Sequence, residues 1–247
     1  MEIYCNALVR DNMQIIESIT ELKISKSSRV LILMPHPDDE AVFTTGLILF
    51  LHRNNIPLKV ITLTKGEASS LRFGLKPNED LSKARVKEQK RAFTILKVKD
   101  YEIKNIPDGQ IENNKTEIKN IIQTQIKSFK PTHLVTLEPD GIYGHPDHVA
   151  LSRFVTQTCK SPLKLLYATV CPHFVLPKSS RMAKIAKIEP IPAQFQLNLA
   201  LSDIIIKLKT LNAHGSQFRN FWHLFGTAYV FLRNKMLFRE YFTYYEK

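Results

Sequence analysis

Cysteine is scarce in this chain of 247 residues, and its spacing argues against two common kinds of protein. The three cysteines, Cys5, Cys159 and Cys171, are odd in number and stand far apart. Such a set provides neither a disulfide framework nor the paired CxxC pattern of a structural zinc site. A chain of this length needs no cross-links to bury a full core. A reducing compartment is the simplest expectation, so we predict a cytoplasmic protein.

Long apolar runs are also lacking. No stretch approaches the about 18 uncharged apolar residues that a membrane-spanning helix needs. Residues 221–232 come nearest but are too short, so we expect them to form a buried helix in the C-terminal part. The first residues show none of the charged, apolar and small-residue zones of a signal peptide. The sequence therefore predicts no membrane span.

Two nucleic-acid-related signatures are absent as well. No stretch interleaves basic and aromatic residues densely enough to indicate nucleic-acid binding. No glycine-rich phosphate loop follows the first apolar run, which argues against a nucleotide site. The charge itself is strongly basic, with 35 Lys and Arg against 23 Asp and Glu. This excess is either a solvated lysine-rich surface or an attraction to an anionic partner.

What the sequence does contain is a regular alternation of short apolar runs and amphipathic segments. Residues 30–34 are five apolar residues bounded by polar ones, which is typical of a strand buried on both faces of a parallel sheet. The alternation favours right-handed βαβ units on a mainly parallel sheet. We expect strands at 30–34, 58–63, 101–106, 133–137, 164–170 and 195–199. We expect helices at 12–24, 40–53, 80–97, 115–129, 145–158 and 202–211.

The chain is expected to form a single domain over residues 1–247. The apolar stripe of Ile15, Ile16, Ile19 and Leu22 predicts an N-terminal helix at about 12–24. The proline-rich segment 171–192 is interpreted as a loop or lid rather than a linker. The aromatic-rich tail at about 218–247 is expected to pack on the body of this domain.

Two histidine-acid clusters follow predicted strands. Pro35-His36-Pro37-Asp38-Asp39-Glu40 comes directly after strand 30–34. Gly144-His145-Pro146-Asp147-His148 comes after strand 133–137 and a loop. Ligands of open α/β sheets bind at the carboxyl ends of the strands. We therefore expect the two clusters to meet around one divalent metal ion, with zinc as the leading choice.

The residue types suit a hydrolytic metal site. Zinc takes histidine nitrogen and carboxylate oxygen, and catalytic sites keep one position open for water. A hydrolase also needs a general base and a group that faces the oxyanion. Spacing does not show which acid binds the metal and which takes the proton. Five candidates share these roles: His36, Asp38, Asp39, His145 and His148.

The sequence resembles the LmbE-like, or PIG-L-type, family of zinc-dependent N-acetylglucosamine deacetylases. The resemblance implies a three-layer Rossmann-like α/β fold with a mainly parallel sheet. It spans roughly residues 30–217 and also implies an amino-sugar substrate. Membrane-anchored members of the family carry a spanning helix, which we do not expect in this chain, and a homo-oligomer is possible. The motifs that carry it are the two clusters, Thr64-Lys65-Gly66-Glu67, Arg85-Val86-Lys87-Glu88, Pro107-Asp108-Gly109 and His214-Gly215-Ser216-Gln217.

The resemblance also divides the roles. It implies one zinc ion per chain, bound by His36, Asp39 and His148, with Asp38 as the general base. The expected reaction is attack of a metal-activated water on an acetamide carbonyl, which releases acetate and a free amino sugar.

The remaining site residues are assigned by the same resemblance. His145, held in its charged form by Asp147, would stabilise the oxyanion or protonate the leaving amine. Arg85 and Asp108 would hydrogen-bond sugar hydroxyls.

Four residues of these motifs also have purely structural interpretations. Glu40 either supports the metal ligands or only stabilises the positive end of the following helix. Arg85 could instead form a surface pair with Glu88. Asp108 could only make a turn. His214 caps or lines the site, or merely packs.

The leading functional hypothesis is a zinc-dependent deacetylase of an N-acetylglucosamine-containing molecule. One alternative is an amidase that cleaves a larger amide of an amino sugar, which a panel of acyl glucosaminides would distinguish. The other is a non-catalytic protein that binds sugars or anions through its basic surface. Equal sugar affinity in the wild type and Asp38→Asn, without turnover in either, would favour that last alternative.

Overall fold

The computed structural model describes residues 13–172, 174, 190–218 and 230–246 of the chain. The described strands form an eight-stranded sheet in the order β1-β7-β8-β6-β5-β2-β3-β4. Strand β8 is antiparallel to both its neighbours, β6 and β7, and the other neighbouring pairs are parallel. The strands are β1 Gln14–Ile15, β2 Val30–Met34, β3 Leu58–Thr64, β4 Tyr101–Ile106, β5 His133–Leu137, β6 Lys164–Thr169, β7 Phe195–Asn198 and β8 Arg239–Tyr244.

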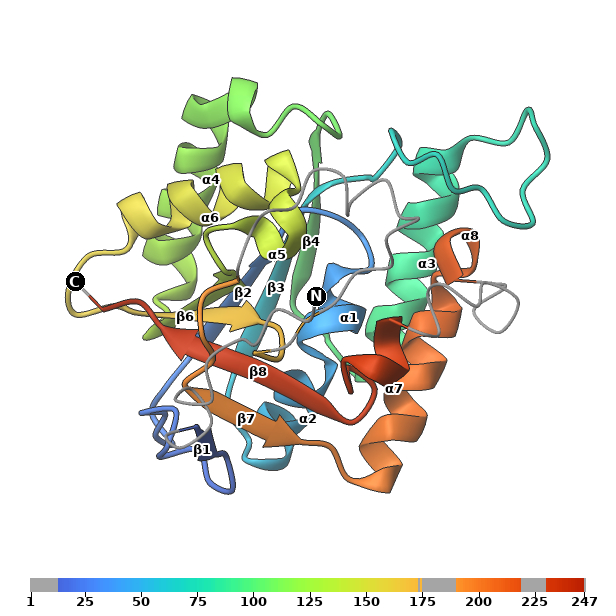
Figure 1. Cartoon of the computed structure of the whole chain (residues 1–247). Helices are drawn as coiled ribbons and strands as arrows, with labels where there is room; N and C mark the ends of the chain where they lie inside the picture. Colours follow the sequence, from blue (N-terminus) through green and yellow to red (C-terminus); the bar gives the residue numbers. More distant parts are fainter. Residues whose placement is uncertain (1–12, 173, 175–189, 219–229, 247) are drawn as a thin grey trace, which may run out of the picture.

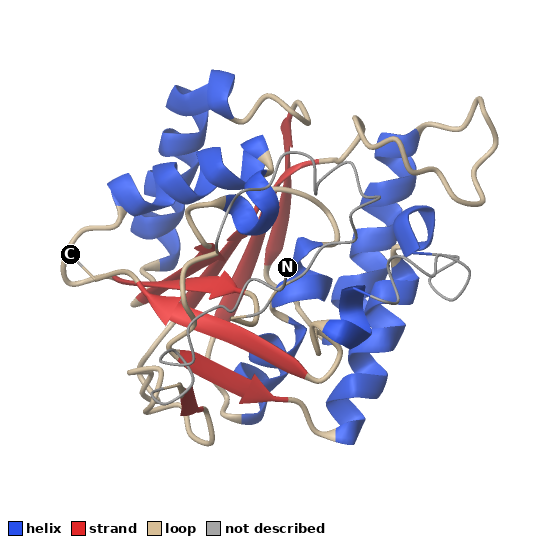
Figure 2. Cartoon of the chain, in the orientation of Figure 1, coloured by secondary structure: helices blue, strands red, loops and turns tan. Residues whose placement is uncertain are grey.

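Helices cover both faces of this sheet, so the molecule has the predicted three layers (Figure 1, Figure 2). Helices α2, α3 and α7 contribute to the apolar core on one face, and α4 and α6 to the core on the other. The helical segments are α1 Asp39–Phe43, α2 Thr45–Arg53, α3 Leu81–Leu96, η2 Glu112–Asn114, α4 Lys115–Phe129, α5 Gly141–Gly144, α6 Pro146–Thr158, α7 Leu201–Ala213 and α8 Gly215–Phe218.

Strand β2 shows how the sequence builds the two cores. Its five residues are all buried. Because side chains alternate across a strand, Ile32 and Met34 belong to the core beneath α2 and α3. Leu31 and Leu33 belong to the core beneath α4 and α6. An uninterrupted apolar run is therefore required at this position.

The strand order creates a switch point at the carboxyl ends of β2 and β5. From β2 the chain moves outward through β3 to β4, and it then returns to the other side of β2 as β5. Connections on the two sides of this point run in opposite directions, which leaves a crevice outside the strand ends. The first cluster follows β2 and the second follows β5, so both begin at this switch point (Figure 1).

The predicted N-terminal helix is wrong in its described part, residues 13–24. Gln14 and Ile15 form the edge strand β1, which pairs in parallel with β7. Turns follow, and Lys23 has a positive φ of 48°. The apolar side chains of Ile16, Ile19 and Leu22 are buried as expected, but turns rather than a helix present them to the core. A sheet partner distant in the sequence outweighs the local helical stripe.

The aromatic-rich tail is more than an appended segment, because it provides β8 in the interior of the sheet. Tyr241 and Phe242 are buried, and the strand lies between β6 and β7. The stretch 221–232 is expected to be helical. Its residues 221–229 lie outside the described chain, and its remaining residues belong to a helical turn at 230–233. Much of the predicted loop 171–192, residues 173 and 175–189, also lies outside the described chain.

The remaining predicted elements are confirmed with small changes of boundary. The predicted helix 40–53 is divided into α1 and α2 at Thr44, whose φ of −136° is not helical. The hydroxyl of Thr44 donates to the carbonyl of Glu40 at 3.1 Å. This break turns α1 into a short segment that directly follows the first cluster.

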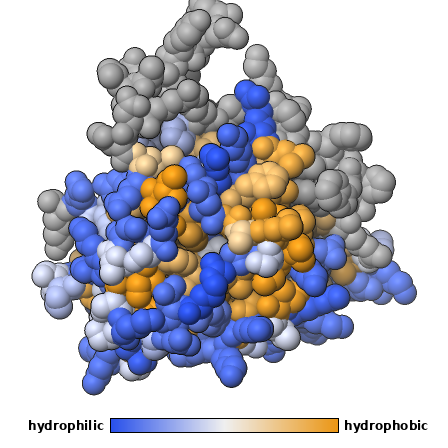
Figure 3. Space-filling model, turned by 90° about the horizontal axis from the view of Figure 1, so that it is seen from below, coloured by the Kyte–Doolittle hydropathy of each residue, from blue (hydrophilic) through white to orange (hydrophobic). Residues whose placement is uncertain are grey.

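The surface seen from below carries an apolar area among hydrophilic side chains (Figure 3). The large apolar side chains exposed in the described chain include Leu201, at 74%, and Ile205 one turn later on α7. Among the described helices, none is long and apolar enough to cross a membrane.

Candidate metal centre

The first cluster is held at the switch point by the ends of two neighbouring strands. Pro35 lacks an N–H group and follows the last residue of β2, which ends the strand. Its carbonyl accepts hydrogen bonds from both the backbone N–H and the hydroxyl of Thr64, each at 3.0 Å. The ends of β2 and β3 are thereby joined, and His36 emerges directly above them.

Three carboxylates converge on the buried ring of His36. Its Nε2 lies 3.0 Å from Oδ1 of Asp108 and 3.2 Å from Oδ2 of Asp147. Its Nδ1 lies 3.4 Å from Oδ2 of Asp39. These acids come from three separate segments of the chain, so the fold itself assembles a strongly negative environment around one imidazole.

The second cluster approaches from the side of β5 and α6. His145 is the N-cap of α6, and its Nδ1 accepts the backbone N–H of Asp147 at 3.2 Å. His148 lies one turn into the same helix, with Nε2 3.5 Å from Oδ1 of Asp39. The ring centroids of His36, His145 and His148 are 4.6 to 5.3 Å apart. The two clusters therefore meet, as the sequence predicts.

The pKa values of His36, Asp39 and His148 are all shifted from their usual values. Burial lowers the pKa of His36, but hydrogen bonds to Asp108, Asp147 and Asp39 outweigh it and raise the pKa well above the usual value. Burial raises the pKa of Asp39, but His148 and His36 outweigh it and lower the value. Burial lowers the pKa of His148 to about 3, which leaves a neutral imidazole. Neutral imidazole and ionised carboxylate are the forms that bind metals, so Asp39 and His148 are already in the binding form, whereas His36 would release its proton when a cation binds.

These donors fit a divalent metal ion. Two groups place one ligand atom of each member within 4.8 Å of the others: His36, His145 and His148, and His36, Asp108 and Asp147. Nδ1 of His148 is buried without a hydrogen-bond partner among the described residues, and Nε2 faces Asp39. A cation would also balance the carboxylates around His36. The residues can hold a metal ion, and their nitrogen and oxygen donors suit zinc.

Neither of these two groups contains Asp39, and the predicted ligand set of His36, Asp39 and His148 rests on pairwise contacts. Asp39 bridges the two imidazoles of His36 and His148, at 3.4 and 3.5 Å. The contacts bring together all eight residues singled out from the sequence, and the choice of three ligands among them stays a prediction.

The predicted base, Asp38, lies beside the cluster and is paired with Arg85. Its Oδ2 is 3.0 Å from Nη2 of Arg85. Burial, which the attraction of Arg85 only partly offsets, raises the pKa of Asp38 to about 6. A carboxyl with a pKa near the working pH is suited to accept and return a proton.

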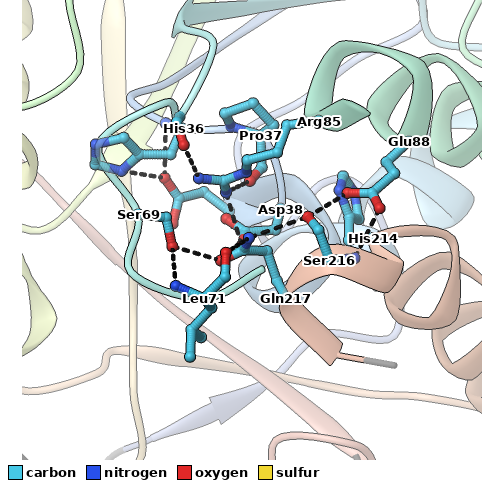
Figure 4. A network of polar contacts seen from close by, with 12 residues as sticks. His36, Pro37, Asp38, Ser69, Leu71, Arg85, Glu88, His214, Ser216 and Gln217 are labelled. Atoms are coloured by element: carbon cyan, nitrogen blue, oxygen red, sulfur yellow. Dashed lines mark hydrogen bonds and ion pairs between the residues drawn. The ribbon is translucent and has the colours of Figure 1, made fainter. Parts of the chain in front are cut away.

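Arg85 lies below the cluster rather than at an open surface. Its side chain is buried, and its guanidinium donates to the carbonyls of Pro37 and Gly66, the latter at 2.9 Å (Figure 4). A Cβ atom on Gly66, which has a φ of +67°, would lie 2.0 Å from Nη1 of Arg85. Arg85 therefore orients Asp38 and the loop before it. Its contact with a sugar stays a prediction.

Asp108 also makes structural contacts at the site. Besides its contact with His36, its Oδ2 accepts the N–H of Ala68 at 2.9 Å, and its own N–H donates to Glu67 at 3.0 Å. The turn Pro107-Asp108-Gly109 is thereby joined to the loop after β3. The predicted contact of Asp108 with the substrate stays a prediction.

Asp147 does not hold His145 in a charged form as expected. Its carboxylate accepts the N–H groups of Gly109 and Ile111 at 2.8 and 3.1 Å and pairs with His36. Burial and the neighbouring His36 lower the pKa of His145, so its neutral form is favoured. The acid joins the second cluster to the turn after β4 instead.

The motif His214-Gly215-Ser216-Gln217 reaches the site from the far end of α7 (Figure 4). Glu88 accepts both the N–H and the hydroxyl of Ser216 at 2.7 Å, so the alternative of a surface pair between Arg85 and Glu88 is wrong. Gln217 accepts the hydroxyl of Ser69 at 2.9 Å and donates to the carbonyl of Leu71 at 3.2 Å. The loop after β3 is thus attached to α8.

Sequence reasoning missed two residues on the β5 side. The ring of Tyr143 lies 5.5 Å from that of His148 and 6.0 Å from that of His145. The buried carboxylate of Glu138 accepts the N–H groups of Asp140, at 2.9 Å, and of Ile142. Tyr143 stands two residues before His145, and this proximity to the second cluster indicates a place near the site. Nothing local identified Glu138.

The described fold and site define a doubly wound α/β protein with a candidate metal centre at its switch point. The chain belongs to the PIG-L family: the family model described as GlcNAc-PI de-N-acetylase matches residues 31–159.

Comparison with known proteins agrees with this assignment. A probable N-acetyl-alpha-D-glucosaminyl L-malate deacetylase 2 of Bacillus anthracis is 36% identical over 132 residues, which cover 52% of this chain and 58% of that protein. A 1D-myo-inositol 2-acetamido-2-deoxy-alpha-D-glucopyranoside deacetylase of Mycobacterium sp. (strain KMS) is 27% identical over 150 residues, which cover 52% of this chain. The match spans only 49% of that second relative.

A solved structure also shares the fold. The crystal structure of the A40926 pseudoaglycone deacetylase Dbv21 superposes with a TM-score of 0.66, covering 89% of this chain and 97% of that one. The sequence identity is 16%, so this likeness concerns the fold alone.

Proposed function

We propose that this chain is a metal-dependent N-deacetylase that hydrolyses the acetamide of an N-acetylglucosamine-containing small molecule or glycoconjugate. The observation that carries the proposal is the convergence of His36, Asp39 and His148 with Asp38 beside them at the switch point. The names of the two relatives, which describe deacetylases of glucosamine derivatives, support the substrate class.

The proposed metal is zinc, one ion per chain, held by His36, Asp39 and His148. When bound, it would polarise the acetamide carbonyl and lower the pKa of the attacking water. We propose that the whole chain acts as one deacetylase domain. We further propose that it works in the cytoplasm.

The chain's own residues supply the proton transfers. Asp38, in its ionised form, accepts a proton from the attacking water, and the contact with Arg85 keeps its carboxylate oriented. Asp38 then returns this proton to the leaving amine. His145 is neutral and its Nδ1 accepts the N–H of Asp147, so its proton is on Nε2, from which we propose that it donates a hydrogen bond to the oxyanion. Products are acetate and a free amino sugar.

Metal analysis combined with acetate release tests this proposal. Purified protein is assayed with N-acetylglucosamine and a panel of its conjugates, before and after chelation and after zinc is returned. We expect acetate release that chelation abolishes and zinc restores. Retention of both stoichiometric metal and activity in His148→Ala would contradict the ligand assignment.

A parallel acyl panel tests the alternative of a larger-amide amidase. Glucosamine carrying acetyl, butyryl and longer acyl groups is offered at equal concentrations. The deacetylase proposal expects the acetyl compound to give the highest kcat/KM. Rejection of the acetyl compound together with turnover of a longer amide would favour the amidase.

A further inference from the structure

Asp38 has a backbone conformation that non-glycine residues rarely adopt. Its φ is 107° and its ψ −24°, in the left-handed region. Such a conformation is strained and persists only where the surroundings impose it. The same residue is the proposed general base, so whatever imposes this conformation also determines where the base stands.

The side chain of Glu40 holds this strained backbone. Its Oε2 accepts the N–H of Asp38 at 3.1 Å. The carbonyl of Asp38 accepts the N–H groups of Ala41 and Val42 at 3.0 Å, at the start of α1. Glu40 thus folds back onto the residue that begins its own helix, as in a capping box. The N–H and the carbonyl of Asp38 are thus both hydrogen-bonded, and Arg85 donates to the carbonyl of Pro37 in the same peptide group as that N–H.

Glu40 is itself held by His214, which is distant in the sequence. Nε2 of His214 lies 2.9 Å from Oε1 of Glu40, and neither side chain has any exposed area. Nε2 of Gln89 lies 3.3 Å from Oε2 of Glu40. A buried carboxylate needs such partners, because an unpaired charge in the interior is strongly destabilising. His214 is the C-cap of α7, so the corner between α7 and α8 stands directly behind the base.

A second buried pair serves as an internal comparison. Glu240 on β8 lies 2.8 Å from Nζ of the buried Lys207 and accepts the N–H groups of Gly46 and Leu47 at the start of α2. Glu240 resembles Glu40 in three ways. Both side chains are buried, and both accept N–H groups at the start of a helix. Each also contacts a basic side chain of α7, which is Lys207 for Glu240 and the C-cap residue His214 for Glu40. In the described part of the chain, Glu240 has no hydrogen bond or ion pair with a residue of the candidate site.

We propose that Glu40 and His214 are positioning residues for Asp38. The pair keeps the backbone of Asp38 left-handed and thereby aims its carboxylate at the attacking water. This role rests on the proposed deacetylase function for its catalytic meaning, but the conformation of Asp38 can be measured without any substrate.

The test uses three single variants of the full chain. His214→Leu removes the donor to Glu40, and His214→Gln keeps a donor at that place. Glu240→Gln is the matched control, because it disturbs an equally buried glutamate elsewhere. For each variant we measure kcat and KM for acetate release, metal content, thermal stability and the φ angle of Asp38 in a crystal structure.

His214→Leu is expected to lower kcat about ten- to a hundredfold, the scale of a misplaced catalytic group, with KM within about twofold. Metal content should be unchanged and Asp38 should relax to negative φ. His214→Gln should recover most of the activity. Glu240→Gln should lose stability but keep its kcat. A His214→Leu protein with wild-type kcat and a left-handed Asp38 would overturn the proposal.

A double-variant comparison separates positioning from general destabilisation. In an Asp38→Asn background, His214→Leu should add no further loss of kcat, because the group that it positions is already disabled. An equal loss in both backgrounds would overturn the proposal. If His214→Leu does not fold, Glu40→Gln replaces it, since it leaves one acceptor where the N–H groups of Asp38 and His214 now use two.

Failure of the two proposals can be told apart. If the wild type releases no acetate from any conjugate, the proposed function fails, and the positioning role is decided by the φ of Asp38 in the wild type and in the folded variant. An unchanged left-handed Asp38 then refutes the role, and relaxation to negative φ supports it.

Discussion

Oδ1 of Asp39 lies 3.5 Å from Nε2 of His148 and joins the two histidine-acid clusters across the switch point. Asp39 begins α1 after strand β2, whereas His148 lies in the first turns of α6 after β5. The contact makes the site depend on both halves of the sheet, so each half can be tested by a substitution on its own side.

His148→Ala should abolish stoichiometric metal binding. With metal at 100 times its Kd, the wild type should gain about 2.7 kcal/mol in free energy of unfolding. The variant should gain far less, because one ligand is gone. Zinc titrations followed by chemical denaturation measure the difference. His52 lies outside both histidine-acid clusters, so the control variant His52→Ala should gain as much stability from zinc as the wild type.

Asp38→Asn should keep the metal but lower kcat by about 10² to 10⁴, the usual contribution of a general base. The pH profile gives a second readout. Burial raises the pKa of Asp38 to about 6, and only the ionised form accepts a proton. Activity should therefore fall as the pH decreases through about 6, or lower once a cation is bound nearby. A wild-type profile that is flat down to pH 4 would contradict this role.

Arg85→Ala should reduce both kcat and stability, because it leaves the Asp38 carboxylate and two carbonyls without their donor. Removing one partner of a buried pair costs about 3 to 5 kcal/mol. Steady-state kinetics and chemical denaturation distinguish this structural role of Arg85 from direct contact with the sugar. A higher KM with unchanged stability would indicate that Arg85 binds substrate directly.

Gly66→Ala should be more harmful than Gly109→Ala. Both glycines have positive φ, so each alanine adds backbone strain on the order of 1 kcal/mol. At Gly66 the new Cβ would also lie 2.0 Å from the guanidinium of Arg85, whereas nothing lies within 4 Å at Gly109. Only Gly66→Ala should therefore lower kcat. Equal effects of the two substitutions would show that the contact with Arg85 is unimportant.

His133 should contribute a decline in stability as the pH falls from about 6.5 to about 4. Burial lowers the pKa of this histidine from 6.5 to about 4. The unfolded chain therefore binds a proton over this range that the folded protein does not, and folding becomes less favourable as the pH falls. The loss is on the order of 2 to 3 kcal/mol. His133→Gln should remove this part of the pH dependence. The midpoint of chemical denaturation, measured at several pH values for the wild type and the variant, tests this.

Much of the fold could be predicted from the sequence because its signals are local. The apolar run of β2 and the proline at its end determine a buried strand that stops at His36. The site could be predicted for the same reason, since its histidines and acids stand in short clusters at strand ends. Asp39 and His148 each stand in such a cluster.

What escaped prediction depends on partners distant in the sequence. The stripe Ile15, Ile16, Ile19 and Leu22 suits a helix, but pairing of Gln14 and Ile15 with β7 outweighs it. The contact between Glu40 and His214 joins residues 174 positions apart, so no local pattern reveals it. The role of Asp147 was misplaced because its carboxylate turns toward His36 and not toward its neighbour His145.

The interior position of β8 has a consequence for how the protein is made. Strands β7 and β1 reach the rest of the sheet only through β8, the last strand in the described chain. Proteins are synthesised from the N-terminus, and segments fold as they emerge. The centre formed by β2 to β6 can therefore assemble on the ribosome, but β1 and β7 must wait until residues 239–244 have been added. A nascent chain halted before residue 239 would leave both strands unattached and Lys207 without its carboxylate.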